Sequence, residues 1–208
     1  MSDQAISASE VNAPHTASAS DPLDELLQRS RRMDWRFLLP DPRLGRVVYF
    51  GPADDPLRAA LADFADAVTD ADALAPNSPE PFDVAVLRTQ PPERLAQART
   101  LLKPGGVLYV EIQRRAGRGI PWQLRRYAAA AERAGFGEIE TFWNWPNFTR
   151  CTRILPVDDA CALTNAVVNN RRGPLAWVML NAVRFGFHLG VVGWAAPCLS
   201  LIARRETS

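Results

Sequence analysis

Short apolar runs alternate with segments of helical spacing from Arg46 to Trp143 of this 208-residue chain. The apolar runs contain few polar residues, which is typical of strands that are buried on both faces. Strands of this kind, when helices separate them, form a parallel sheet that helices cover on both sides. The sequence therefore predicts an α/β fold, with strands over 46–51, 67–70, 82–88, 105–112 and 138–143 and helices over 56–65, 92–102 and 122–134.

The carboxyl ends of these strands form the expected binding edge, because ligands of open α/β sheets bind beyond those ends. Gly51, Asp70 and Arg88 lie at the ends of three strands, and Glu111 to Arg115 lie at the end of a fourth. We therefore expect a functional site to be built from these positions.

The charges are balanced in sum, with 24 basic and 23 acidic side chains and a net charge of +1. Nucleic-acid-binding proteins usually carry a strongly basic surface, so nucleic acid is not an expected partner. Residues 1–83 hold 15 acids and 7 bases, a net charge of −8, whereas residues 84–208 hold 8 acids and 17 bases, a net charge of +9. Such an asymmetry can mark a partner or membrane surface. We favour the simpler alternative, in which the two halves fold together and neutralise each other.

The length fits one globular domain with tails. The first 20 residues are polar and lack the apolar segment of a secretory signal, which predicts a disordered leader and a cytoplasmic location. The three cysteines lack metal-ligand spacing and are expected to be buried free thiols, with no metal site. Along the chain we expect a leader (1–20), an N-terminal helix with an extended connector over 34–45 (21–45), the α/β core (46–156), a helical apolar insertion (157–196) and a last strand with a tail (197–208).

The segment 174–196 is strongly apolar but contains Arg184 and His188. A membrane-spanning helix requires about 20 apolar residues without a central charge, so membrane association is the less favoured alternative. The favoured alternative is a core helix or an interface through which the chain forms a homo-oligomer.

Two stretches resemble the class I S-adenosylmethionine-dependent methyltransferases, of the type 11-like group. LLKPGGVLYVEI at 101–112 is similar to the turn and fifth strand of that family, where Pro104 stops a helix and two glycines allow the reversal. DALAPNSPEPFDVAVL at 72–87 is similar to the family's adenine-site Asp-Ala pair and fourth strand. The resemblance implies a Rossmann-like methyltransferase sheet with helices on both faces, whose last, antiparallel strand lies in PCLSLIARR at 197–205.

The resemblance also implies a place for S-adenosylmethionine, with cofactor-binding positions at Gly51, Asp70, Asp72 and Ala73. The interval from Asp70 to Phe82 is too short for a further helix and strand, so one helix-strand unit of the family is expected to be missing.

The predicted cofactor loop departs from the family pattern. Gly51 alone remains of the family's Gly-x-Gly-x-Gly loop, and Pro52 removes an amide donor. Asp54 and Asp55 bring carboxylates toward the place of the cofactor's own carboxylate, and like charges repel. Tyr49 stands where the family has an acidic residue. The loop therefore indicates a degenerate cofactor site.

The sequence offers few groups for catalysis. Glu111 could orient an acceptor hydroxyl, but an ion pair with a neighbouring arginine is the simpler reading. His188 could act as a general base, but a lone histidine in an apolar segment is more often a packed residue. The candidate substrate or partner residues are Arg88, Arg114, Trp143 and Trp145, of which the tryptophans could instead anchor the insertion to the sheet.

Two hypotheses about function follow. The first is a degenerate methyltransferase-like protein, a pseudoenzyme that acts as a binding or assembly module in a bacterial biosynthetic pathway. Its ligand would be a small molecule, a glycan or a protein. The second is an active S-adenosylmethionine-dependent methyltransferase that acts on a hydroxyl of a small molecule, glycan or lipid-linked substrate. The degenerate loop favours the first hypothesis, because such a loop is poorly suited to cofactor binding. The fold alone does not decide between the two.

Overall fold

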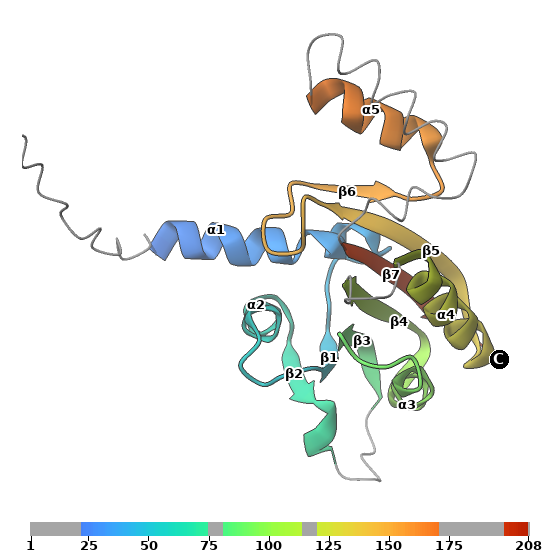
Figure 1. Ribbon diagram of the computed structural model, residues 1–208. Coiled ribbons are helices and arrows are strands. Elements are labelled where there is room, and N and C mark those ends of the chain that lie inside the picture. Colours follow the sequence, from blue (N-terminus) through green and yellow to red (C-terminus); the bar gives the residue numbers. More distant parts are fainter. Residues whose placement is uncertain (1–21, 75–80, 114–119, 171–197, 208) are drawn as a thin grey trace, which may run out of the picture.

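A seven-stranded sheet is the centre of the computed structural model, which describes residues 22–74, 81–113, 120–170 and 198–207 (Figure 1). The strand order is β2-β1-β3-β4-β7-β5-β6. The strands are β1 (Arg46–Phe50), β2 (Ala67–Asp70), β3 (Phe82–Arg88), β4 (Leu102–Gln113), β5 (Phe136–Trp145), β6 (Arg153–Pro156) and β7 (Cys198–Arg205). The helices are α1 (Pro22–Arg32), α2 (Pro56–Phe64), α3 (Arg94–Leu101), α4 (Ile120–Arg133) and α5 (Ala160–Asn170), with 3-10 helices η1 (Asp34–Leu38) and η2 (Ala71–Ala73).

The sheet has a parallel half and an antiparallel half. β1 pairs in parallel with β2 and β3, and β3 pairs in parallel with β4. β7 then runs antiparallel between β4 and β5, and β6 pairs antiparallel with the free edge of β5. The predicted α/β sheet and its antiparallel last strand are therefore confirmed.

The predicted loss of one helix-strand unit is also confirmed. Between the end of β2 at Asp70 and the start of β3 at Phe82, the described residues form only η2. β2 is consequently the edge strand of the parallel half.

Helices cover both faces of the sheet. Successive residues of a strand point to opposite faces, so β1, β3 and β4 each contribute to two core clusters. On one face, Val48, Ala85 and Leu108 pack in a core cluster with residues of α3 and α4. On the other face, Val47 and Val86 pack with residues of η1 and α2. Figure 1 shows α3 and α4 on one side of the sheet and α2 on the other.

The predicted extended connector over 34–45 is wrong at its start, where the chain forms η1. Trp35 of η1 is 1% exposed and stacks on Tyr109 of β4, with ring centroids 4.0 Å apart and an interplanar angle of 11°. Met33, just before η1, is also fully buried. The tight turn is favoured because it brings the side chains of Met33 and Trp35 into the core together. An extended segment would bury them less compactly.

The C-terminal region contains one element that the sequence did not reveal, the short edge strand β6. The helix expected after β6 is α5, which begins directly after two aspartates. Asp159 Oδ1 caps it by accepting hydrogen bonds from the backbone N–H groups of Cys161 (2.8 Å) and Ala162 (3.0 Å). The leader 1–20 and the segment 174–196 lie outside the described residues. Within the described part of the chain, no helix has the length and apolar character needed to cross a membrane.

The charge asymmetry of the sequence is partly resolved by contacts between the two halves. Among the described residues, three ion pairs join an acid before residue 84 to a base after it, namely Asp55 with Arg88, Asp72 with Arg94, and Asp83 with Lys103. These contacts neutralise part of the asymmetry along the parallel strands.

The Lys103–Gly106 turn uses its two glycines for different reasons. Gly105 has φ +76°, a left-handed conformation that glycine adopts without strain. Gly106 is limited by space instead, because a Cβ there would lie 2.8 Å from the Lys103 carbonyl oxygen and 3.1 Å from that of Asp83. Only Gly105 therefore provides the positive-φ reversal that was expected of both glycines.

This difference predicts the effects of two alanine substitutions on stability. Gly105→Ala would make only an ordinary contact, 3.9 Å from Thr207 Cγ2, and is expected to cost about 1 kcal/mol through backbone strain. Gly106→Ala crowds backbone atoms of two paired strands and is expected to cost about 2 kcal/mol or more. Urea denaturation of both variants measures the loss, and a smaller loss for Gly106→Ala than for Gly105→Ala would contradict this account of the turn.

Candidate functional site

The carboxyl ends of the parallel strands bring two predicted residues together. Arg88 is the last residue of β3, and it is in register with Glu111 of the neighbouring strand β4. Parallel strands place their carboxyl ends along the same edge, so these side chains meet as the sequence indicated.

Glu111 is fully buried and forms ion pairs with two arginines. Arg32, at the end of α1, approaches both carboxylate oxygens, with Nη1–Oε1 2.5 Å and Nη2–Oε2 2.6 Å. Arg88 Nη1 donates to Oε2 at 2.6 Å, and the Tyr109 hydroxyl donates to Oε1 at 3.3 Å. Burial is the largest single influence on the pKa of Arg32 and lowers it, but the charge and hydrogen bonds of Glu111, together with the nearby Tyr109 and Asp55, raise that pKa overall. The carboxylate is therefore fully engaged by the chain itself.

Asp55 extends this set of ion pairs to the start of α2. Its Oδ1 accepts a hydrogen bond from the Leu57 backbone N–H at 2.7 Å and so caps the helix. Its Oδ2 pairs with Arg88 Nε, and the residue is only 8% exposed. Arg32, Glu111, Arg88 and Asp55 thus form a continuous set of ion pairs, here called the carboxyl-edge network, in which only Arg88 is partly exposed.

Tyr49 fills the space beside the predicted cofactor loop. Its ring packs so closely against Gly51 that a Cβ at this glycine would overlap it. Tyr49 is 1% exposed, and its hydroxyl has no hydrogen-bond partner among the described residues. Burial, followed by the nearby charge of Asp55, raises the pKa of Tyr49. Gly51 is therefore needed in this structure to make room for a side chain of the chain itself.

The acidic positions expected to contact the cofactor have partners of their own. Asp70 is bound by Arg58 through two hydrogen bonds, Nε–Oδ1 2.7 Å and Nη2–Oδ2 2.8 Å. Asp72 accepts from Arg94 at 3.1 Å on the surface. Ala73, in the same 3-10 helix as Asp72, is exposed. Tyr49 is in register with Asp70, so Gly51 and Asp70 do lie near each other at the end of the sheet.

The remaining predicted positions lie at the end of β5, on the antiparallel half of the sheet, or outside the described residues. Trp143 is 8% exposed and packs with Leu163 of α5 and Leu199 of β7, and its ring meets that of Trp145 edge-on at 4.9 Å. The two tryptophans thus lie between the sheet and α5. Arg114 and His188 lie outside the described residues.

A cleft of about 380 Å³ lies over the carboxyl-edge network. It is bounded by the polar face of α1, the start of α2, the end of β3 and the loop between β5 and β6, through Glu25, Gln28, Arg29, Arg32, Asp55, Pro56, Arg88 and Thr149. Its charged lining includes both arginines that hold Glu111.

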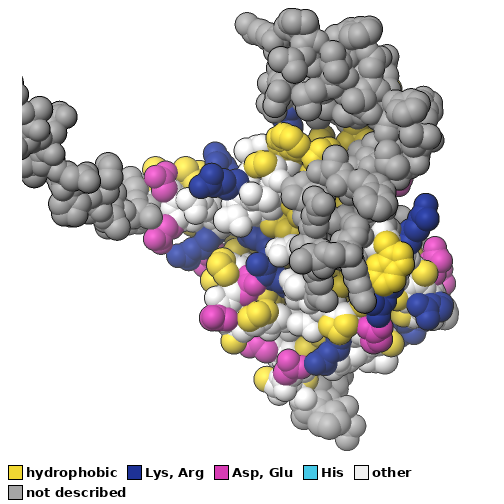
Figure 2. Space-filling view, in the orientation of Figure 1, with side chains coloured by type: hydrophobic (Ala, Val, Ile, Leu, Met, Phe, Trp, Pro, Cys, Tyr) yellow, Lys and Arg dark blue, Asp and Glu magenta, His cyan; other side chains and the backbone are white. Residues whose placement is uncertain are grey.

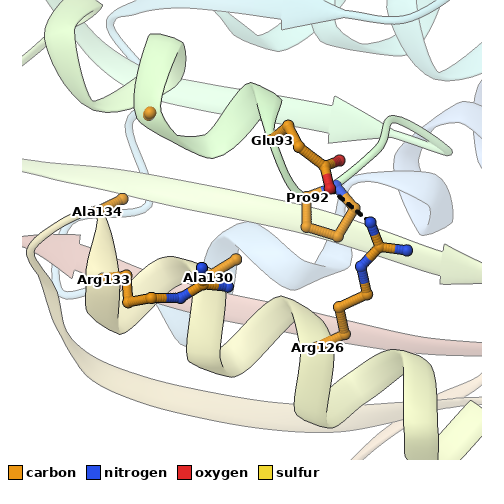
Figure 3. Close-up of a pocket in the computed structure, with 7 residues that line it drawn as sticks. Pro92, Glu93, Arg126, Ala130, Arg133 and Ala134 are labelled. Carbon is orange, nitrogen blue, oxygen red and sulfur yellow. Dashed lines mark hydrogen bonds and ion pairs between the residues drawn. The ribbon is translucent and has the colours of Figure 1, made fainter.

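A second hollow, of about 210 Å³, lies between α3 and α4 (Figure 3). Arg126 and Glu93 close one end of it through an ion pair of 2.5 Å, and small residues such as Ala130 line its base. No residue that the sequence singled out for binding or catalysis contributes to this hollow.

Sequence reasoning missed the roles of Arg32 and Asp55. The Asp-Pro pair at 55–56 is a helix-start signal of the same kind as Asp21-Pro22, so the capping role of Asp55 could have been found. Arg32 carried no such signal, because its partner Glu111 is 79 residues away in the sequence.

Two of the three cysteines match the expected buried thiols. Cys151 and Cys198 are buried and Cys161 is exposed. Burial raises the pKa of Cys198 to about 12, so its thiol stays protonated at neutral pH.

Known structures with a similar arrangement include several methyltransferases. Phosphoethanolamine N-methyltransferase 2 of Haemonchus contortus, solved with phosphomonomethylethanolamine and S-adenosylhomocysteine, is 14% identical, with a TM-score of 0.44. The match covers 88% of this chain and 53% of that one, so the chain spans about half of that enzyme's length. A possible histamine N-methyltransferase of Thermotoga maritima is 16% identical over 88% of each chain, with a TM-score of 0.43. The sequence matches no protein-family model and no curated protein.

The strand order decides the fold. β7 enters antiparallel between β4 and β5, the Gly105-Gly106 turn leads into β4, and β3 follows directly beside β1. The sheet is a mixed, Rossmann-like methyltransferase sheet with helices on both faces. Relative to that fold, the chain lacks one helix-strand unit after β2 and adds the edge strand β6.

The residues at the cofactor position of the methyltransferase fold do not fit S-adenosylmethionine in this arrangement. Both carboxylate oxygens of Asp70 are occupied by Arg58. The N-terminus of α2, which could otherwise attract an anionic group, is already capped by the Asp55 carboxylate. The Tyr49 ring covers Gly51. Asp70, the start of α2 and Gly51 thus already have partners within the chain.

Loss of the Glu111 charge is expected to destabilise the protein strongly. Glu111→Gln keeps the size of the side chain but leaves Arg32 and Arg88 without their shared anion, which should cost about 3 kcal/mol. The matched control is Glu138→Gln, because Glu138 forms an exposed ion pair of 3.0 Å with Arg204. That variant should change stability by about 1 kcal/mol or less. The free energy of unfolding in urea measures both, and equal small effects would contradict the structural role of Glu111.

Proposed function

We propose that this protein is a methyltransferase-fold binding or assembly module that does not use the cofactor position of its fold. We further propose that it serves a bacterial biosynthetic pathway. The observation that carries the proposal is the carboxyl-edge network, in which Arg32 of α1 holds Glu111 at the place where the fold otherwise meets its ligands.

The network is self-sufficient in charge. Its two arginines and two carboxylates balance, and the helix cap uses the remaining acceptor of Asp55. A cofactor that displaced Arg88 or Arg32 would leave Glu111, at 0% exposure, with an incompletely compensated charge. Breaking a buried pair from one side costs about 3 to 5 kcal/mol, which would be subtracted from the affinity of the ligand.

The cleft above the network offers a different mode of binding. Its volume of about 380 Å³ is within the range of small-molecule sites, and Arg29, Gln28 and Thr149 line it without belonging to the network. Most of the residues that line it carry polar or charged groups, so its ligand would be a polar small molecule, a glycan or a polar segment of a protein. Such a ligand would bind over the network rather than replace it.

The alternative function is an active S-adenosylmethionine-dependent methyltransferase that acts on a hydroxyl. The position of the cleft at the carboxyl edge of the sheet favours it. Glu111 is a poor candidate for the general base of such an enzyme, because both of its carboxylate oxygens already accept hydrogen bonds from arginine. The proposal and its alternative therefore differ in whether the cofactor binds.

Calorimetric titration of the full chain with S-adenosylmethionine and S-adenosylhomocysteine separates the two. We expect no saturable binding of either compound at micromolar concentration, since the network and Arg58 occupy the contacts that the cofactor needs. Arg58→Ala, which frees Asp70, should not restore binding, because Tyr49 and Asp55 remain in place. Micromolar affinity of the unmodified protein for either compound would overturn the proposal.

A further inference from the structure

The N-terminal helix α1 turns its polar face toward the molecule. Glu25, Gln28, Arg29 and Arg32 recur at helical spacing and all line the cleft over the carboxyl-edge network. Arg32 reaches Glu111, and Arg29 donates a hydrogen bond to Asp63 of α2 at 3.2 Å. Charged contacts, rather than an apolar stripe, therefore hold this helix to the protein.

The apolar stripe of α1 faces away from the molecule. Leu23, Leu26 and Leu27 are 59%, 53% and 45% exposed, and they occupy the side of the helix opposite Glu25 and Arg32. A surface helix of a globular protein normally buries its apolar stripe against the core. Figure 1 shows α1 extending away from the sheet, and Figure 2 shows hydrophobic side chains on it beside charged ones. Three adjacent exposed leucines on one helix indicate a contact surface.

We propose that this stripe is a dimer interface, in which α1 of one copy packs antiparallel against α1 of a second copy. The first turn of α1 is acidic, with Asp24 and Glu25, and the last turn is basic, with Arg29, Arg31 and Arg32. A helix with charges arranged in this way is complementary to itself when a second copy runs in the opposite direction. A two-fold axis beside Leu27, at the C-terminal end of the leucine stripe, produces such a pairing, and it closes without further copies.

Asp24 and Arg31 are the residues that would join the two copies at the edge of the stripe. They are seven residues apart, so they lie on the same side of the helix, and both are exposed. In the antiparallel pair, Asp24 of one copy lies at the height of Arg31 of the other, and the symmetry forms this contact twice. Like charges would meet instead if the helices ran in parallel, with Asp24 beside Asp24.

A membrane surface fits this helix less well than a second copy does. Helices that lie on membranes carry a basic polar face toward anionic headgroups, often with aromatic residues on the apolar side. The first turn of α1 carries Asp24 and Glu25 beside the leucines, and its polar face is turned inward to the cleft. The charges of α1 therefore favour a second copy over a lipid surface.

Sedimentation velocity of the full chain over a range of micromolar concentrations tests the interface. The unmodified protein is expected to form dimers, and Leu26→Glu should weaken the dimer on the order of tenfold or more by placing a charge in the apolar contact. The matched control is Trp122→Gln, which removes an apolar side chain that is 52% exposed on α4. This control should leave the dimer unchanged, and circular dichroism should show that both variants are folded.

A charge exchange tests the orientation. Asp24→Arg and Arg31→Asp should each weaken the dimer, because each places like charges opposite one another. The double variant restores opposite charges across the two-fold axis and should recover much of the affinity. A parallel or unrelated arrangement predicts no such recovery.

Three outcomes would overturn the proposal. The first is a protein that remains monomeric across the concentration range, with its leucines covered by another part of the chain or unpaired. The second is a dimer that Leu26→Glu does not affect, which places the interface elsewhere. The third is binding of the monomer to anionic vesicles that Leu26→Glu abolishes, which assigns the stripe to a membrane surface.

Discussion

The buried carboxylate of Glu111 is the group on which the arrangement of the carboxyl edge depends. A charge that is fully removed from water is tolerated only with close counter-charges, and Glu111 has two of them, Arg32 and Arg88. Through Arg32 the carboxylate fixes the end of α1, and through Arg88 and Asp55 it is connected to the start of α2. One ion set therefore joins four elements of the fold.

The same ion set is the basis of the proposal that this protein does not use the cofactor position of its fold. The fold normally leaves the carboxyl edge of its parallel strands open for a ligand. Here three contacts within the chain lie at that edge, namely Tyr49 against Gly51, Arg58 on Asp70 and α1 on Glu111, and the cleft lies above them. α1 contacts the protein through its polar face, which leaves its leucines exposed. Contact with Glu111 and exposure of the stripe are thus two sides of one placement of α1.

Much of the fold could be predicted from the sequence, because buried parallel strands are continuous apolar runs. The pairing of Arg88 with Glu111 followed from strand ends, and the capping role of Asp55 was open to prediction from Asp55-Pro56. Arg32 could not be predicted, because its partner is 79 residues away and is reached only once α1 has docked. η1 escaped prediction for a similar reason, since Trp35 turns inward to meet Tyr109 on a distant strand.

A crystal structure of the full chain grown with millimolar S-adenosylhomocysteine tests the central claim most directly. The account predicts that Arg32 and Arg88 hold Glu111, that Arg58 holds Asp70, and that no cofactor lies against Gly51. It would be contradicted by S-adenosylhomocysteine bound at Gly51 with its ribose on Asp70, because that complex requires the Tyr49 ring and Arg58 to leave their places.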